Sequence, residues 1–217
     1  MSDLHSQYGA LANIYDGFLT LTGFKRGVEN FFNRIDFTFP KGAKIMDAGT
    51  GTGIAALYLA RRFPDSEILA TDIDERMLGE LRKIADEEGI KNVSVWQNDF
   101  NFPAEVRELG SIETKRLSRN SFDAIFTSGI LEHVDIEKSI PEIASLLKPG
   151  GIFLNLGVKR NPAGAVLGML YNFEPHSIRE IQRICGSSGL TDIRMLKLTG
   201  ADFPANLSRV AIFAKKQ

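Results

Sequence analysis

The sequence IMDAGTGTG at residues 45–53 joins a short apolar run to a glycine-rich turn. Residues 44–48 predict a buried strand, and residues 54–63 predict a helix that Pro64 stops. The glycines allow a tight turn and a close approach to a ligand because they carry no Cβ, and the free N–H groups of the following helix suit an anion. Asp47 ends the strand where open α/β sheets place their ligand crevice, so its charge suits a cationic group. An ordinary βα turn shares this pattern, so the stretch alone does not decide between them.

The composition is that of an ordinary globular domain. The 217 residues are 43% hydrophobic and 24% charged, and the net charge is -1. A surface that binds nucleic acid usually carries a basic excess, so this balance argues against nucleic acid as a partner. Cys185 is the single cysteine, which excludes an internal disulfide and a cysteine metal cluster, and no metal site is predicted. Residues 1–7 are polar, and no apolar run is long enough to cross a bilayer, so we expect a cytoplasmic protein.

Strands and helices alternate along most of the chain, which predicts a parallel sheet with helices on both faces. The predicted strands of this alternation are residues 44–48, 67–71, 93–97, 122–127 and 152–156. The polar stretch 101–120 predicts a partial helix near 104–109 and then a loop. Two late strands, 191–198 and 209–214, are joined directly and predict an antiparallel pair.

Three local signals divide the second half of the chain. Ser139 and Glu142 have capping-box spacing and predict the start of a helix, and residues 148–151 predict a turn. Residues 158–175 form a long connection after a strand, at the position where substrate loops lie. A second capping box, at Ser177, predicts the start of another helix.

The first part of the chain predicts two amphipathic helices within residues 4–36, separated near Gly23. These helices are expected either to cover the sheet or to form a lid over a site. We therefore divide the chain into an N-terminal helical cap at 1–36 and a ligand-binding domain at 37–217.

In its order of motifs, the sequence resembles the class I S-adenosylmethionine-dependent methyltransferases, and most of all their small-molecule and quinone-ring branch. The motifs that carry the resemblance are DAGTGTG at 47–53, TDID at 71–74, NDF at 98–100, and FDAI at 122–125 with the later LKPGG at 147–151. Each is weak alone, but all four occur in the right order on the right elements. The resemblance implies a Rossmann-like seven-stranded, mostly parallel sheet whose last strand is antiparallel.

The resemblance also implies how S-adenosyl-L-methionine would be held. Asp47 and the turn would hold its methionine part, Asp72 its ribose hydroxyls, and Asp99 the adenine amino group. Ile73 and Phe100 would enclose the adenine ring. The full set of cofactor residues implied is Asp47, Gly49, Thr50, Gly51, Gly53, Asp72, Ile73, Asp99, Phe100, Ser128 and Gly129.

The methyl acceptor is the part of the function that the sequence leaves most open. His133 follows the fourth predicted strand and is the candidate general base, with a role in shaping the cofactor pocket as the alternative. Tyr15 is a candidate substrate contact on the N-terminal helices. Met169, Tyr171 and Phe173 either line an apolar substrate pocket or pack in the core.

The leading hypothesis is methyl transfer to a small molecule, by in-line displacement. A methyltransferase acting on RNA or protein is the second, supported only by Lys159-Arg160 and Lys25-Arg26. A non-catalytic binding module on the same fold is another alternative. A NAD-type dehydrogenase fits poorly, because Ile54 stands where the G-x-G-x-x-G pattern needs glycine. The sequence predicts no oligomeric state.

Overall fold

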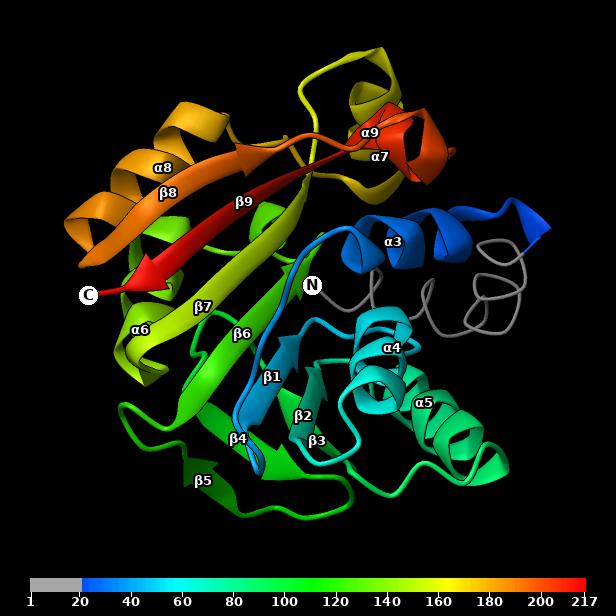
Figure 1. The fold of residues 1–217 in the computed structure, drawn as a ribbon, viewed down its shortest axis with the longest axis vertical. Coiled ribbons are helices and arrows are strands. Elements are labelled where there is room, and N and C mark those ends of the chain that lie inside the picture. The colour runs from blue at the N-terminus through cyan, green and yellow to red at the C-terminus, as the bar shows by residue number, and fades with distance from the viewer. Residues whose placement is uncertain (1–20) are drawn as a thin grey trace.

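A single nine-stranded sheet forms the centre of the computed structural model, which describes residues 21–217 (Figure 1). The strands run in the order β5-β4-β3-β2-β1-β6-β7-β9-β8. They are β1 (Lys44–Ala48), β2 (Glu67–Asp72), β3 (Val93–Asn98), β4 (Glu105–Glu108), β5 (Thr114–Arg116), β6 (Phe122–Ser128), β7 (Leu147–Val158), β8 (Leu190–Leu196) and β9 (Arg209–Lys216). The α-helices are α3 (Phe24–Asn33), α4 (Ile54–Arg62), α5 (Glu75–Glu87), α6 (Ile136–Leu146), α7 (Pro162–Tyr171), α8 (Ile178–Ser187) and α9 (Ala205–Ser208). The 3-10 helices are η1 (Leu131–His133) and η2 (Gly200–Asp202).

The five central strands are parallel, as the βα alternation predicted. The late hairpin is also confirmed: β9 pairs antiparallel with both β7 and β8 and lies between them. The predicted number of seven strands is wrong, because two short strands, β4 and β5, extend the sheet beyond β3. The carboxyl ends of the parallel strands therefore meet the start of β9 at one edge of the sheet, where Val158 pairs with Arg209.

The segment 104–109, predicted as a partial helix, instead contains the strand β4, which lies between β3 and the edge strand β5. The Asn98 side chain donates hydrogen bonds to the carbonyls of Phe102 (3.1 Å) and Glu105 (2.7 Å), which turns the chain back along β3. In β4 only Val106 is buried, so a single apolar side chain fixes the strand. The segment has too few apolar residues to establish a helical period. Its pairing with β3 decides its structure instead.

Helix α6 begins three residues before the predicted capping box. Asp135 is its N-cap, and the Asp135 side chain accepts a hydrogen bond from the Glu137 N–H at 3.1 Å. Ser139 lies inside the helix and donates its hydroxyl to the Phe100 carbonyl at 3.0 Å. Aspartate and serine cap helices about equally well, so the sequence alone does not decide between Asp135 and Ser139. Ser139 does not cap the helix, because its hydroxyl bonds the Phe100 carbonyl.

Two further local predictions differ from the structure. Residues 148–151 belong to β7, which begins at Leu147, and a register shift between Phe122 and Ala124 accommodates the glycines of that segment. The connection 158–175 contains α7, whose N-cap Asn161 accepts from the Gly164 N–H at 2.8 Å. The helix predicted to start at Ser177 is confirmed as α8, capped by that serine.

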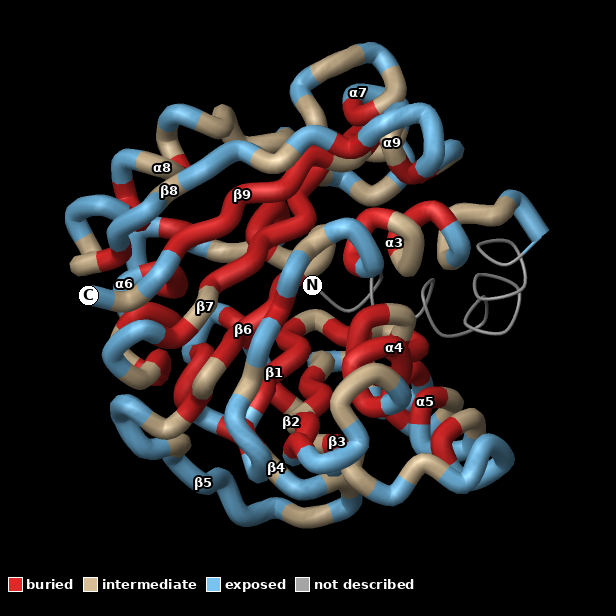
Figure 2. The backbone as a smooth tube through the Cα atoms, in the orientation of Figure 1, coloured by how far each residue is buried: buried red, intermediate tan, exposed pale blue. Residues whose placement is uncertain are grey.

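Helices cover both faces of the sheet, because successive strand residues point to opposite sides. Ile45 belongs to the hydrophobic cluster under α3, α4 and α5, and Met46 belongs to the cluster under α6 and α8. The central strands are buried on both faces, whereas β5 is exposed (Figure 2). Helix α3 contributes Phe31 and Phe32 to the first cluster, so it packs as cover on the sheet. The earlier predicted helix, within residues 4–20, lies outside the described residues.

Candidate active site

The glycine turn between β1 and α4 is tied to the neighbouring strand β2. The Thr50 N–H donates to the Thr71 carbonyl, and the Gly51 N–H donates to an Asp72 carboxylate oxygen, both at 2.9 Å. A Cβ at Gly49 would lie 2.6 Å from Ile130, and a Cβ at Gly53 would lie 2.7 Å from Leu81. Those two glycines are therefore required by packing within the protein.

Gly51 differs from the two other glycines of the turn. Its φ of 55° favours glycine, and a Cβ built on it would meet no atom within 4 Å. The open space of the predicted ligand site thus lies above Gly51, beside the carboxylate of Asp72.

Asp47 lies beneath this turn and is 1% exposed. One of its carboxylate oxygens accepts hydrogen bonds from the Thr50 hydroxyl (2.6 Å) and from the Ala56 N–H (3.0 Å). Burial raises the pKa of Asp47 to about 6; the bonds from Thr50 and Ala56 oppose that shift, and the nearby Asp72 adds to it. Asp47 therefore holds the turn onto the start of α4, and a cationic ligand beside it would favour its ionised form.

Asp72 stands at the end of β2 with both carboxylate oxygens engaged. One oxygen accepts from Gly51, and the other accepts from the Asp74 N–H at 3.0 Å. Burial raises the pKa of Asp72, and the backbone hydrogen bonds oppose that rise. The next side chain, Ile73, is 39% exposed, so it offers an apolar surface next to an acid. Asp74 caps α5 by accepting from the Arg76 N–H at 2.9 Å.

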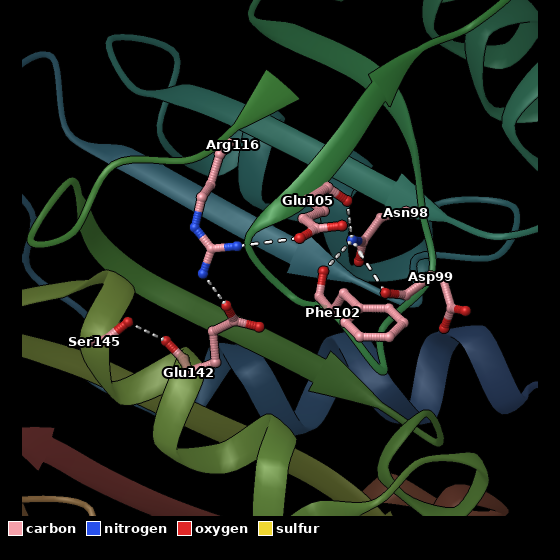
Figure 3. A network of polar contacts seen from close by, with 7 residues as sticks. All are labelled: Asn98, Asp99, Phe102, Glu105, Arg116, Glu142 and Ser145. Carbon is pink, nitrogen blue, oxygen red and sulfur yellow. Dashed lines mark hydrogen bonds and ion pairs between the residues drawn. The ribbon is translucent and has the colours of Figure 1, made fainter. Parts of the chain in front are cut away.

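The turn after β3 carries two of the predicted adenine contacts, and Figure 3 shows its polar network. Asp99 is exposed, and one of its carboxylate oxygens accepts from both the backbone and the side chain of Asn101. Phe100 is only 3% exposed and belongs to the cluster under α6, so its ring has almost no surface to offer a ligand. Phe102, which the sequence analysis did not select, is 56% exposed on the same turn.

The same network fixes the edge of the sheet beside this turn. Arg116 of β5 bridges Glu105 of β4 (3.1 Å) and Glu142 of α6 (2.7 Å), and Ser145 donates to the Glu142 carbonyl (Figure 3). Each of these exposed ion pairs adds little stability, but together they join the antiparallel strands β4 and β5 to α6.

The end of β6 carries Ser128, Gly129 and, one turn later, His133. Desolvation lowers the pKa of the His133 imidazole, Glu132 opposes that shift, and Arg209 adds to it. The imidazole remains exposed, and its ring packs edge-on against Phe173 with the ring centroids 5.0 Å apart. A histidine kept neutral and open to solvent suits proton acceptance.

Two charged residues near His133 were missed by the sequence analysis. Glu132 is 9% exposed; one of its oxygens accepts from the Val158 N–H at 2.6 Å, and the other is buried without a hydrogen-bond partner. Arg209 begins β9, and its Nε and Nη1 atoms are also buried without partners. Glu132 interrupts the apolar segment 130–134, which is a signal that could have drawn attention to it, whereas Arg209 stands just before the apolar run 210–214 and gives no such signal.

A pocket of about 460 Å³ lies along α7 and the chain that follows it. Met169 and Phe173 both line it, although Met169 is 84% exposed. Tyr171 is not among the residues that line this pocket. Because Phe173 also contacts His133, the pocket lies beside the candidate base. Tyr15 lies outside the described residues.

Residues 21–217 contain neither a cluster of metal ligands nor a helix that could span a membrane. No group of three or more His, Cys, Asp or Glu side chains there could hold a metal ion. None of the helices there has the length and apolar character needed to span a bilayer.

A doubly wound sheet with β9 reversed, a glycine turn after β1 and an acid after β2 defines the class I S-adenosylmethionine-dependent methyltransferases. Residues 45–151 match the model of a family described as "Methyltransferase domain". Residues 45–151 of the chain therefore belong to this family of methyltransferase domains.

Curated relatives extend the match beyond these motifs. An uncharacterized methyltransferase of Mycobacterium tuberculosis (strain ATCC 25618 / H37Rv) is 31% identical over 71% of this chain and 52% of its own length. A ubiquinone biosynthesis O-methyltransferase of Acinetobacter baumannii (strain AYE) is 30% identical over 60% of this chain and 51% of its own length. The chain thus spans about half the length of the curated relatives it matches.

Solved structures agree on the fold. A geranyl diphosphate C-methyltransferase from Streptomyces coelicolor A3(2), in complex with S-adenosyl-L-homocysteine, superposes with a TM-score of 0.70 at 15% identity, covering 88% of this chain and 76% of that one. A SAM-dependent methyltransferase from Aquifex aeolicus gives 0.63 at 18% identity, covering 92% of each chain. At these identities the likeness supports the fold alone.

Proposed function

We propose that this protein transfers a methyl group from S-adenosylmethionine to a small-molecule acceptor. The observation that carries the proposal is the open space above Gly51, beside the Asp72 carboxylate, which the exposed Ile73 side chain follows in the chain. Each Asp72 oxygen accepts one backbone N–H and has a further lone pair for a ribose hydroxyl, and a carboxylate beside an apolar side chain suits a nucleoside.

The residues around this space fit the cofactor. Asp72 accepts from the ribose hydroxyls, and Asp99 accepts from the adenine amino group. Ile73 packs on one side of the adenine, and on the other side we assign Phe102 in place of the buried Phe100. The methionine part lies against the turn that Asp47 supports. The turn residues Gly49, Thr50, Gly51 and Gly53, with Ser128 and Gly129 at the end of β6, complete the site.

The cofactor supplies a methyl group already activated by its sulfonium. The protein has to orient the acceptor in line with that methyl group and exclude water. His133 accepts the proton when the acceptor must lose one, because its lowered pKa keeps the imidazole neutral near pH 7. Phe173 packs against the imidazole and limits its orientations.

The acceptor binds in the pocket along α7, beside His133. Met169 and Phe173 give this pocket apolar side chains, and we keep Tyr171, the last residue of α7, and Tyr15 as further candidate contacts of the acceptor. The relative named for ubiquinone biosynthesis supports a small acceptor of this kind. The division into a helical cap at 1–36 and a cofactor domain at 37–217 belongs to the same proposal.

The experiment is a transfer assay with S-adenosylmethionine labelled in its methyl group. Small-molecule extracts, total RNA and a protein lysate are offered as separate acceptor pools. We expect label in the small-molecule pool, with loss of transfer in Asp72→Ala and retention in the control Asp65→Ala, which alters an exposed aspartate before β2. Transfer only to RNA or protein would establish the second hypothesis, and cofactor binding without any transfer would indicate a non-catalytic module.

A further inference from the structure

Arg209 has the features of a cation that awaits a ligand. Its Nε and Nη1 atoms are buried without hydrogen-bond partners, and no ion pair among residues 21–217 includes it. Arg209 as a whole is only partly buried, but guanidinium nitrogens that are buried without partners are costly to the fold, so such atoms are normally satisfied by an anion. The guanidinium is also the side chain best suited to hold a carboxylate or phosphate through two parallel hydrogen bonds.

The position of Arg209 directs this group toward the proposed reaction site. In β9 it shares the face of Ala211 and Phe213, which is the face covered by α3. Its guanidinium carbon lies 5.4 Å from the centroid of the Phe24 ring, which supports the cation from one side. Its Nη1 atom lies 3.2 Å from where a Cβ on Gly129 would stand, so any larger residue at 129 would press on the guanidinium.

Two neighbouring charged residues, Lys159 and Glu132, are consistent with an anionic ligand and indicate which other groups it carries. Lys159, which follows β7, also has no ion-pair partner among residues 21–217; its ammonium donates to the Asn206 carbonyl at 2.6 Å. Glu132 forms no ion pair with Arg209 within the described chain, and one of its oxygens is buried without a partner. The Arg209 guanidinium therefore offers hydrogen-bond donors to an oxyanion, and the Glu132 carboxylate offers one acceptor to a hydroxyl or amine.

We infer that Arg209 binds a carboxylate or phosphate group of the methyl acceptor, so that the acceptor is an acidic small molecule. This inference rests on the proposed function, because it places the anion beside the end of β6, where His133 and the methyl group meet. The pocket along α7, which combines apolar side chains with Arg160, Asn161 and Glu174, then holds the rest of the acceptor. The methionine carboxylate of the cofactor is the other source of the same chemistry, and the experiment separates the two.

The test measures anion binding to the full-length protein saturated with S-adenosylhomocysteine. Diphosphate is followed by broadening of its phosphorus NMR signal, and benzoate by calorimetry. Arg209→Gln should weaken binding of at least one probe by about tenfold or more, the loss expected for one charged hydrogen-bonding group. Arg209→Lys should lose less. The matched control is Arg119→Gln, which removes an exposed arginine before β6, at the opposite edge of the sheet, and should change nothing. Circular dichroism confirms that each variant is folded.

Several results would overturn the inference. Failure of both probes to bind the wild type, or equal binding to Arg209→Gln, would show that Arg209 holds no acceptor anion. Competition between the probes and S-adenosylhomocysteine, with weaker S-adenosylhomocysteine binding in Arg209→Gln, would assign Arg209 to the cofactor carboxylate instead. Failure of the wild type to bind S-adenosylhomocysteine at all would refute the proposed function itself, and that result is read from a separate titration.

Discussion

Replacement of Asp47 by asparagine should change how the stability of the ligand-free protein depends on pH. Burial raises the pKa of Asp47 from 3.8 to about 6, a difference of about two units, which corresponds to about 3 kcal/mol. The folded-state pKa lies above the unfolded value, so the contribution of Asp47 to stability is complete below pH 3.8 and is lost as the pH rises through about 6. Asp47→Asn removes this dependence, and its amide oxygen can still accept from Thr50 and Ala56.

The assay is urea unfolding of both proteins across this pH range. The wild type should lose up to about 3 kcal/mol relative to Asp47→Asn between pH 4 and pH 7. Burial also raises the pKa of Asp72, but both proteins contain Asp72. Most of its effect therefore cancels in the difference between their free energies of unfolding. A difference that is independent of pH, or that favours the wild type more as the pH rises, would refute the assignment of a raised pKa to Asp47.

The same carboxylate should link cofactor binding to proton release. A cationic ammonium beside Asp47 favours its ionised form and restores a lower pKa, so binding near pH 6 should release a proton. Calorimetry of S-adenosylmethionine in two buffers with different ionisation enthalpies measures that proton. The release should be smaller in Asp47→Asn, and an unchanged release would place the ammonium elsewhere.

Three further predictions concern single side chains. Asp72→Ala should weaken S-adenosylmethionine binding by about 1–3 kcal/mol in a calorimetric titration, whereas Asp74→Ala, which removes only the cap of α5, should keep the affinity. His133→Ala should lower the transfer rate and remove the fall in rate that accompanies protonation of His133 in the wild type; an unchanged rate and pH profile would exclude His133 as the base. Cys185 is buried, and burial raises its thiol pKa to about 12, so iodoacetamide should label it only after unfolding; rapid labelling of the native protein would contradict its placement on the buried face of α8.

The central part of the fold could be predicted from the sequence because its signals are local. The apolar run that forms β1, the glycines after it and the acid after β2 are each read from consecutive residues. The antiparallel pairing of β8 and β9 follows from two late apolar strands with a short connection, although that connection also holds η2 and the one-turn helix α9, which the sequence did not predict. These are the elements whose identity depends least on distant contacts.

The remaining elements depend on contacts that no local pattern reveals. The sequence of β4 is mostly charged. It forms a strand because the Asn98 side chain donates hydrogen bonds to carbonyls of the turn that follows β3, and because Val106 is buried. The ring of Phe100 was expected against the cofactor and is buried under α6, where Ser139 bonds its carbonyl. Arg209 reaches the end of β6 only because β9 pairs with β7 in a particular register.

The most direct test of the whole account is calorimetric titration of the purified, cofactor-free protein with S-adenosylmethionine and, separately, with NAD. We expect micromolar binding of S-adenosylmethionine and no binding of NAD, because Ile54 stands where the dinucleotide pattern G-x-G-x-x-G needs glycine. Binding of NAD instead, or failure of the folded protein to bind S-adenosylmethionine, would contradict it.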